Sequence, residues 1–166
     1  MILKSIVDIE NELINEFSCG NRDLDLFLKK HAFKNDQIGY GKTFVGIENN
    51  QIIGFFTLCS ASIKFESLPK GNVSSLPRYP IPCIRIARLA VKKEMQNKGY
   101  GKLLLKEALL KIIYASATIG IRLVVVDAKE TAKFFYAKYG FQPLIEEEST
   151  LFLEIETIIN AYKLSK

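Results

Sequence analysis

One segment near the middle of the chain constrains the fold more than any other. Residues 84–91 form an apolar run typical of a buried strand, a loop with Gly99 and Gly101 follows, and residues 100–117 have the apolar spacing of an amphipathic helix. The first amides of a helix have no partner within it, and the helix dipole places partial positive charge there. Because glycine lacks a Cβ atom, a phosphate can approach this backbone closely. The segment therefore predicts a strand–loop–helix unit that can cradle an anion such as a pyrophosphate.

By itself, the two-glycine loop has two interpretations. A tight turn between a strand and a helix would need similar glycines without any ligand. The loop also lacks the longer glycine spacing of dinucleotide-binding folds, and no Lys-Ser/Thr pair of a P-loop follows it. The choice between a ligand site and a plain turn therefore depends on the rest of the chain.

The remaining pattern predicts a mixed α/β fold. Asn21 is a typical helix N-cap, and Asn49-Asn50 separates two β-rich runs in the manner of a hairpin turn. Four of the five prolines lie in residues 69–82, which we expect to form a loop. The unit from 84 to 126 should be a parallel strand–helix–strand crossover. The expected strands are 2–7, 43–47, 52–58, 84–91, 121–126, 141–145 and 151–155. The acidic turn 146–148 should join the last two. Helices are expected after Asn21 and over 32–38, 100–117 and 130–139, and residues 157–166 should form a short helix or a frayed tail.

Length and composition limit the class of protein. A chain of 166 residues with 48% hydrophobic content predicts a single domain over residues 1–166. No apolar run approaches the roughly 20 residues that span a bilayer, and the first residues lack the pattern of a signal peptide, so we expect a cytoplasmic protein without membrane contact. The net charge of +5 fits simple solubility, an anionic ligand such as coenzyme A, or an RNA-bearing substrate.

The cysteines and the histidine do not predict a metal site. Cys19, Cys59 and Cys83 are odd in number and far apart, so we expect buried structural thiols. A zinc site would need more ligands than these thiols and His31 are placed to give. His31, the one histidine, is expected to pack or to cap near a helix end.

The central loop and its flanks resemble the coenzyme-A-binding motif of the GNAT superfamily of N-acetyltransferases. The family pattern Gln/Arg-x-x-Gly-x-Gly/Ala is matched by Gln96-Asn97-Lys98-Gly99-Tyr100-Gly101, and a later family signature is matched by residues 132–141. The resemblance covers residues 17–155. It implies a GNAT fold, which is a mixed, mostly antiparallel sheet with a central pair of splayed parallel strands and helices on both faces, and it implies acetyl-CoA as cosubstrate.

The resemblance also implies the functions of individual residues. By residue type alone, Tyr136 is better explained by an aromatic cluster that packs a helix on a sheet. The resemblance reverses this preference, because Tyr136 occupies the place of the family's catalytic tyrosine and would protonate the departing thiolate of coenzyme A. Many relatives carry asparagine in place of Phe134, so one side-chain contact to the cofactor would be missing here. The expected cofactor-binding residues are Leu89, Ala90 and Val91, whose backbone would pair with the pantetheine arm, and Gln96, Asn97, Lys98, Gly99, Tyr100, Gly101 and Lys102, whose amides would hold the pyrophosphate.

Acid–base chemistry narrows the choice of acceptor amine. A lysine amine, with a pKa of about 10.4, must lose a proton before it attacks, whereas an α-amine at roughly 7.7–8.0 is already partly neutral at pH 7. The motif strands carry no carboxylate except Asp127, so the sequence offers no obvious strong base. We therefore expect an acceptor whose amine has a low pKa.

Within the superfamily, the chain looks like a bacterial toxin branch. The similar stretches are Phe17–Gly20, Leu24–Leu28, Thr43–Val45, Gly54–Leu58, Pro80–Pro82 and Ala87–Val91. Enzymes of this branch acetylate the α-amine of aminoacyl-tRNA, are neutralised by a small ribbon–helix–helix antitoxin, and often form homodimers. The resemblance implies the same acceptor and partners for this chain.

Two other functions stay open at this point. One is a GNAT enzyme that acetylates a small amine, a peptide or a protein N-terminus without acting as a toxin, and the other is a module that binds coenzyme A or RNA without catalysis. Arg88 stands out among the basic residues because it interrupts an apolar strand. Candidate RNA contacts are Lys29, Lys30, Lys34, Lys42, Arg78, Arg85 and Arg88, and the alternative for each is a solvated surface or a contact to the cofactor.

Overall fold

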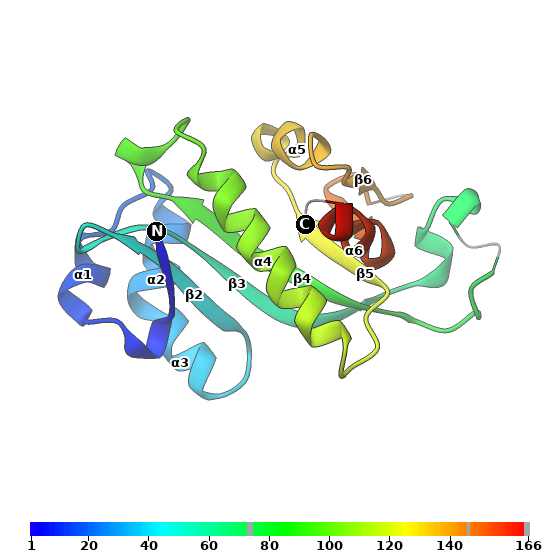
Figure 1. The fold of residues 1–166 in the computed structure, drawn as a ribbon, viewed down its shortest axis with the longest axis horizontal. Coiled ribbons are helices and arrows are strands. Elements are labelled where there is room, and N and C mark those ends of the chain that lie inside the picture. Colours follow the sequence, from blue (N-terminus) through cyan, green and yellow to red (C-terminus); the bar gives the residue numbers. More distant parts are fainter. Residues whose placement is uncertain (73–74, 146, 165–166) are drawn as a thin grey trace. The chain divides into compact units, whose positions relative to one another are not determined.

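The computed structural model describes residues 1–72, 75–145 and 147–164. Backbone contacts divide the chain into two compact units, unit 1 (Met1–Cys59 and Ala87–Leu109) and unit 2 (Ser60–Ile86 and Leu110–Lys166). Two strands and one helix run through both units: β3 (Gln51–Ile63), β4 (Ile81–Val91) and α4 (Tyr100–Ser116). The seven strands are hydrogen-bonded in the order β1-β2-β3-β4-β5-β7-β6 (Figure 1).

Unit 1 begins with a strand and three short helices, followed by a hairpin. Asn21 caps α2, because its Oδ1 accepts hydrogen bonds from the amides of Asp23 at 3.0 Å and Leu24 at 3.2 Å. Asn49 and Asn50 form a two-residue turn with φ values of 49° and 58°, as a tight hairpin requires. Both expectations are confirmed. The elements are β1 (Ile2–Ser5), α1 (Asn11–Glu16), α2 (Arg22–Lys30), α3 (Ala32–Gln37) and β2 (Lys42–Glu48), with β1, β2 and β3 antiparallel to one another.

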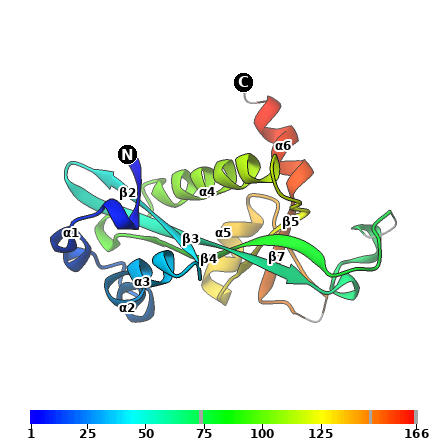
Figure 2. The ribbon, with the colours of Figure 1, turned by 90° about the horizontal axis from the view of Figure 1, so that it is seen from below.

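Helices lie on both faces of the unit 1 strands (Figure 2). Phe27 and Leu28 of α2 pack on one face in a core that includes Phe55 and Ala90. The first turns of α4 lie on the other face, where a Cβ atom on Gly54 would meet the backbone carbonyl of Ala90 and would lie 2.6 Å from Cδ1 of Leu104. Glycine at position 54 therefore allows β3, β4 and α4 to approach closely.

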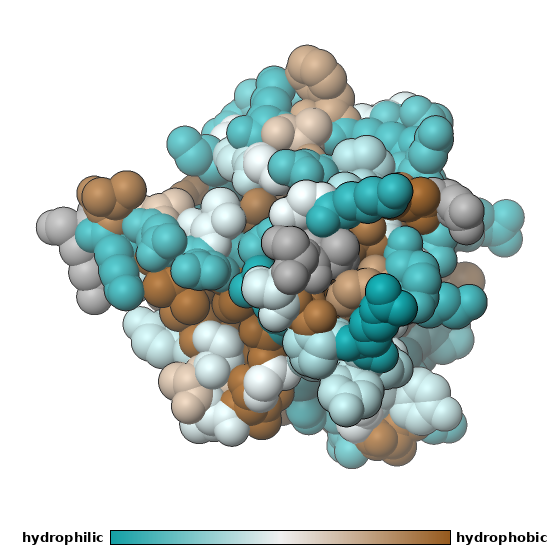
Figure 3. All heavy atoms as spheres, turned by 90° about the vertical axis from the view of Figure 1, so that its right-hand side faces the viewer, coloured by the Kyte–Doolittle hydropathy of each residue, from teal (hydrophilic) through white to brown (hydrophobic). Residues whose placement is uncertain are grey.

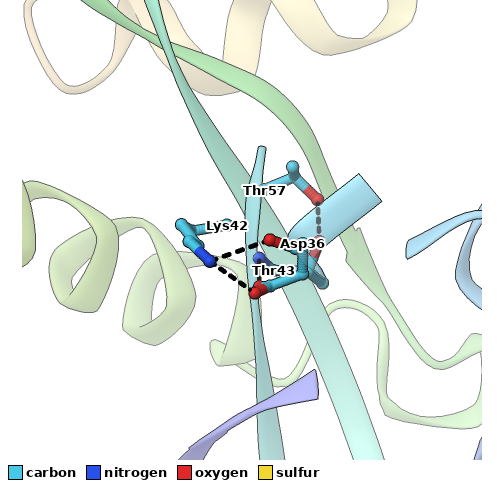
Figure 4. Close-up of polar contacts among 4 residues, drawn as sticks. All are labelled: Asp36, Lys42, Thr43 and Thr57. Carbon is cyan, nitrogen blue, oxygen red and sulfur yellow. Dashed lines mark hydrogen bonds and ion pairs between the residues drawn. The ribbon is translucent and has the colours of Figure 1, made fainter. Parts of the chain in front are cut away.

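A buried carboxylate joins α3 to the start of β2 (Figure 4). Asp36 is 4% exposed, and its oxygens accept hydrogen bonds from Lys42 Nζ at 2.7 Å and from the Thr43 amide at 3.1 Å. The Thr43 and Thr57 hydroxyls are 2.9 Å apart and extend this polar group to β3. The charge of Lys42, a candidate RNA contact, is therefore paired with a buried negative charge.

Unit 2 contains the parallel strand pair. Cys83–Ile86 of β4 pairs with Leu123–Val126 of β5 in parallel, and β4 continues beyond this pairing to Val91. The β5–β7 and β7–β6 pairs are antiparallel, so the sheet is mostly antiparallel with one parallel pair, as predicted. The remaining elements are β5 (Leu123–Asp127), α5 (Glu130–Ala137), β6 (Gln142–Pro143), β7 (Thr150–Glu154) and α6 (Ile155–Leu164).

Unit 2 has a separate hydrophobic core. Leu123 and Val125 of β5 pack with Cys83 of β4 and Phe152 of β7. Figure 3 looks at the side that carries the loop after β3, where hydrophobic residues (brown) are visible between hydrophilic ones (teal). A cavity of about 340 Å³ in this unit is lined by Leu76, Pro77, Tyr79, Pro80, Ile81, Pro82 and Arg122. None of the helices in the described ranges combines the length and the apolar character needed to cross a membrane.

Several expected boundaries differ from the structure. The tail helix α6 begins at Ile155, which we expected to be the last residue of a strand, and β6 covers two residues instead of residues 141–145. The Ile155 amide donates to the Arg122 carbonyl at 3.0 Å, a tertiary contact that an apolar pattern does not reveal. Part of the expected loop 69–82 (residues 73–74), Glu146 of the acidic turn and the last two tail residues lie outside the described residues.

The cysteine and histidine predictions are only partly correct. Cys19 and Cys83 are buried, but Cys59 is only partly buried, so the prediction of a buried thiol is wrong at this position. His31 lies at the junction of α2 and α3 with its side chain exposed, and that side chain makes no capping hydrogen bond. Its backbone performs the capping instead, since its amide donates to the Phe27 carbonyl at 2.9 Å.

Candidate active site

The end of β4 leads directly into the predicted cofactor loop in unit 1. Ala90 is buried, whereas Leu89 and Val91 are partly exposed at the end of the strand. The next two amides are held by backbone hydrogen bonds, from Lys92 to the Ile53 carbonyl at 2.7 Å and from Lys93 to the Ser18 carbonyl at 2.9 Å. The strand end is thus fixed on both sides before the loop begins.

The side chain of Gln96 fastens the loop to its surroundings. Its Nε2 donates to the Cys19 carbonyl at 2.8 Å and to the Val91 carbonyl at 3.1 Å. The sequence predicted that the backbone amide of Gln96 contributes to anion binding. It did not predict the two hydrogen bonds of the Gln96 side chain. The first position of the family pattern, which is Gln or Arg, could have indicated this contact, because both side chains carry N–H groups that can donate to carbonyls.

The loop backbone presents unpaired amides at the start of α4. Asn97 and Gly99 have φ values of 59° and 88°, a conformation that favours glycine and asparagine. The Leu103 amide donates to the Gly99 carbonyl at 3.2 Å. The amides of Tyr100 and Gly101 precede this bond and have no partner within the helix. A Cβ atom on Gly99 would meet nothing within 4 Å, so the backbone there faces open space that a phosphate can occupy.

The side chain of Tyr100 makes a structural contact and does not take part in the proposed anion binding. Its hydroxyl donates a hydrogen bond to the Glu48 carboxylate, which also accepts one from the Met1 ammonium at 3.2 Å. The hydrogen bond from Tyr100 lowers the pKa of Glu48, and the same bond raises the pKa of Tyr100. The start of α4 is thereby tied to the β2–β3 hairpin, and the backbone amide of Tyr100 is the group left for an anion. No sequence pattern predicted this contact.

Basic side chains surround the loop. Lys93, Lys98 and Lys102 form no ion pair with a carboxylate among the described residues. The Nζ atom of Lys98 is 4.0 Å from the sulfur of Met95. Unpaired positive charge beside a helix N-terminus favours an anionic ligand. The loop therefore fits the diphosphate of coenzyme A.

Tyr136 lies on α5 in unit 2 and is 8% exposed. Its ring packs edge-on against Phe135 at 5.0 Å and Phe141 at 5.5 Å between centroids, which matches the aromatic-cluster interpretation. Its hydroxyl makes no hydrogen bond with the part of the chain that the structure describes. Burial raises the pKa of Tyr136 to about 12, because the charged phenolate is poorly solvated there. The residue is thus a protonated phenol with a donor that a ligand can use.

Phe134 differs from Tyr136 on the same helix. Its side chain is 74% exposed, and the Nζ atom of Lys138 lies 5.1 Å from its ring centroid. The ring has no hydrogen-bonding group, so it cannot replace an asparagine contact. Phe134 contributes to a cavity of about 560 Å³ in unit 2, lined also by Lys133, Ala137, Phe141, Pro143, Leu144, Ile145, Glu148 and Leu151.

Each carboxylate oxygen of Asp127, at the end of β5, accepts a hydrogen bond. Arg85 donates to one oxygen, and the Thr150 hydroxyl donates to the other at 3.0 Å. A carboxylate held in this way is a poor general base, and the charge of Arg85, a candidate RNA contact, is already paired. Within the described ranges, no three His, Cys, Asp or Glu side chains are grouped closely enough to hold a metal ion.

The other candidate RNA contacts fall into both units. Lys29 and Lys30 lie on α2 and Lys34 on α3, in unit 1 with Arg88. Arg78 belongs to unit 2, where its guanidinium is 6.0 Å from the centroid of the Phe65 ring. The structure therefore groups the lysines of α2 and α3 with Arg88, and it leaves Arg78 and Arg85 in the other unit.

A strand that ends in an open loop of unpaired amides, in a mixed sheet with one parallel pair, is the arrangement expected of an acyltransferase that uses coenzyme A. Residues 39–143 match the family model described as acetyltransferase (GNAT) domain. The chain belongs to the GNAT acetyltransferase family, and it is an acetyl-CoA-dependent N-acetyltransferase.

Several similar proteins are named as toxins. The chain is 33% identical over 130 residues to a tRNA-acetylating toxin of Mycobacterium tuberculosis, covering 78% of each chain. It superimposes with a TM-score of 0.88 on AtaT complexed with acetyl-methionyl-tRNAfMet, at 28% identity over 97% of this chain and 98% of that one. It also matches AtaTR bound with acetyl-CoA, with a TM-score of 0.84 at 29% identity over 97% of each chain. A mutant AtaT toxin bound to the C-terminus of the antitoxin AtaR matches with a TM-score of 0.80 at 25% identity, over 97% and 96% of the two chains.

Proposed function

We propose that this enzyme transfers the acetyl group of acetyl-CoA to the α-amine of aminoacyl-tRNA and acts as the toxin of a toxin–antitoxin pair. The observation that carries the choice of acceptor is the state of Asp127, whose two oxygens are engaged by Arg85 and Thr150. Without a free carboxylate on β5, the enzyme suits an amine that is already partly neutral near pH 7. The tRNA-acetylating relatives support the same acceptor class.

Each part of the chain would make a distinct contribution to this reaction. The backbone of Leu89, Ala90 and Val91 would pair with the pantetheine arm. The amides that follow Gln96, up to Lys102, would hold the diphosphate, because the Gln96 amide already donates to the Lys93 carbonyl at 3.4 Å. Acetyl-CoA supplies the acetyl group as an activated thioester. Tyr136 would donate its phenolic proton to the thiolate that leaves when the amine attacks. We assign these contributions to one catalytic domain over residues 1–166, and the passage of β3, β4 and α4 through both units supports this assignment.

The experiment that tests this function follows the radioactive acetyl group. The purified enzyme is incubated with labelled acetyl-CoA and bulk charged tRNA, and the label should appear on the aminoacyl ester and be released by mild base as an N-acetyl amino acid. Uncharged tRNA is the matched control and should take no label. Label on polyamines or added peptides, with none on charged tRNA, would instead identify an ordinary small-amine or peptide acetyltransferase.

The pH dependence of the rate should reflect the acceptor and not Tyr136. Because burial raises the pKa of Tyr136 to about 12, the phenol stays protonated across the assay range. We expect kcat/KM for charged tRNA to rise about tenfold per pH unit below the α-amine pKa of roughly 7.7–8.0 and to level off above it. Initial rates between about pH 6 and 9.5 measure this profile. A fall in rate on the alkaline side would contradict the assignment, because it would report loss of the acid's proton.

The proposed acceptor places the reaction in the cytoplasm, where charged tRNA is used for translation. A toxin of this kind requires a neutralising partner, and the AtaR complex of the similar AtaT supports a small antitoxin whose C-terminus binds the enzyme. Expression of the wild-type chain alone should therefore stop growth, and co-expression of the antitoxin should restore it.

A further inference from the structure

The turn of residues 18–20, just before α2, is hydrogen-bonded to the segment that leads into the cofactor loop. The Ser18 carbonyl accepts a hydrogen bond from the Lys93 amide at 2.9 Å, and the Cys19 carbonyl accepts one from Gln96 Nε2 at 2.8 Å. All of these residues belong to unit 1. Two successive carbonyls of the 18–20 turn therefore fix the path of the chain between the end of β4 and Gly99.

The side chain of Lys93 passes over the last residue of the same turn. A Cβ atom on Gly20 would lie 3.5 Å from Cδ and 3.8 Å from Cγ of Lys93. Gly20 also has a φ of 82°, which favours glycine. Across the part of the chain that the structure describes, Lys93 forms no ion pair. The 18–20 turn thus supports a lysine whose charge is available to an anion.

One carboxylate in the first turn of α2 holds the 18–20 turn in shape. Asp25 is half-buried, and its Oδ1 accepts a hydrogen bond from the Cys19 amide at 2.7 Å. Its Oδ2 accepts one from the Ser18 hydroxyl at 2.8 Å, and that hydroxyl accepts one from the Gly20 amide at 3.4 Å. Hydrogen bonds to an ionised carboxylate are stronger than those between neutral groups. Asp25 therefore ties each residue of the turn to α2, directly or through Ser18.

We propose that Asp25 is a positioning residue for acetyl-CoA, which acts by holding the 18–20 turn against the cofactor loop. Asp25 makes no printed-distance contact with the loop itself, and its effect passes through the carbonyls of Ser18 and Cys19. Without the carboxylate, these carbonyls would lose their fixed place, and Lys93 and Gln96 would move with them. Small displacements of groups that bind a ligand are costly. This inference rests on the proposed function of the loop as the diphosphate site, and it does not depend on which amine accepts the acetyl group.

Substitutions at position 25 test the proposal through the affinity for the cofactor. Asp25→Ala should bind acetyl-CoA about tenfold more weakly and raise its KM by the same factor, with kcat at saturating acetyl-CoA within about twofold of wild type. Asp25→Asn keeps an oxygen for the Cys19 amide and gains an amide that can donate to the Ser18 hydroxyl, so most of the affinity should return. Calorimetry gives the dissociation constants, and steady-state kinetics with charged tRNA give KM and kcat.

Two further variants complete the comparison. Asp23→Ala is the matched control, because Asp23 is an exposed carboxylate in the same first turn of α2, and it should bind acetyl-CoA as wild type does. Ser18→Ala removes one of the two hydrogen bonds to Asp25 and should weaken binding by about threefold. It decides the question if Asp25→Ala does not fold.

A truncated acetyl donor separates positioning of the loop from a general effect on the fold. S-acetylpantetheine carries the same thioester and pantetheine arm as acetyl-CoA but has no diphosphate. Asp25→Ala and wild type should use it with equal kcat/KM, because the loop amides would have no diphosphate to hold.

A double substitution tests whether Asp25 acts through the turn. If it does, Asp25→Ala combined with Gln96→Leu should bind acetyl-CoA about as weakly as the weaker single variant, whereas two independent tenfold losses would multiply to about 100-fold. A multiplied loss would contradict the route through the Cys19 carbonyl.

Defined outcomes would overturn the inference. Wild-type affinity of Asp25→Ala for acetyl-CoA would remove the function of Asp25. An equal loss with S-acetylpantetheine, or the same loss in Asp23→Ala, would indicate a general effect on the fold or on the charge of α2. Failure of the proposed diphosphate site is seen separately, because Gly99→Val would then bind acetyl-CoA as wild type does. If wild type placed no label on charged tRNA, the proposed acceptor would fail, and the calorimetric comparison would still decide the function of Asp25.

Discussion

The Tyr136→Phe enzyme should lose about 10²- to 10⁴-fold in kcat while binding acetyl-CoA as tightly as wild type. The substitution removes one hydroxyl that makes no hydrogen bond with the described residues, and it keeps the ring that packs against Phe135 and Phe141. The departing thiolate would then lack its proton source, whereas the loop that we propose to hold the diphosphate would be unchanged. Steady-state kinetics with charged tRNA and calorimetry with acetyl-CoA measure the two effects separately.

Tyr139→Phe is the matched control for this prediction. Tyr139 packs edge-on against Phe135 at 5.3 Å, so the variant loses the same atom close to the same aromatic cluster. Its kcat should equal that of wild type, and both variants should unfold at the wild-type urea concentration within error. If Tyr136→Phe retained a rate within twofold of wild type, the acid would have to be another group.

The Gly99→Val enzyme should bind acetyl-CoA at least about tenfold more weakly than wild type, because it would lose charge-assisted hydrogen bonds from the loop amides. Gly99 has a φ of 88°, which a β-branched residue adopts only at a cost of about 1–3 kcal/mol. Any Cβ atom would also occupy the open space in front of the amides that begin α4. Calorimetric titration with acetyl-CoA gives the dissociation constant.

Gly39→Val separates the effect on binding from the strain. Gly39 has a φ of 78° and no heavy atom within 4 Å of a built Cβ, so it reproduces both the backbone conformation and the free space of Gly99. It lies between α3 and β2, away from the loop in the sequence. Both variants should lose similar unfolding free energy, yet Gly39→Val should bind acetyl-CoA normally. Equal affinities of the two variants would contradict anion binding by the residue 99 backbone.

Local sequence signals predicted the main elements well where a short-range cause exists. Asn21 caps its helix through its own side chain, and Asn49-Asn50 adopts the positive φ angles of a tight hairpin. The parallel pair of β4 and β5 follows from a helix placed between two apolar strands. The strand predicted at residues 151–155 is correct through Glu154, and only Ile155 belongs to α6, because an apolar residue fits the end of a strand and the start of a helix equally.

In the candidate site, too, the sequence predicted local features and missed contacts between distant residues. Glycine placement and the strand–helix order marked the loop at residues 96–102, because the requirements of an anion cradle are local. The sequence could not reveal that Gln96 fastens the loop to Cys19 or that Tyr100 is tied to Glu48, because these partners are 77 and 52 positions apart. Among the basic candidates, Lys42 and Arg85 proved to be paired with Asp36 and Asp127, which residue type does not indicate.

The sequence by itself determined the class of this enzyme and predicted where its cofactor loop lies, since both depend on the order of strand, glycines and helix along the chain. Only the tertiary structure decided which charges are free. Asp127 is occupied and Arg88 is unpaired because of the residues that folding brings against them from β4, β7 and α2. The electrostatic state of a side chain depends on neighbours in space, and distance along the chain carries little information about them.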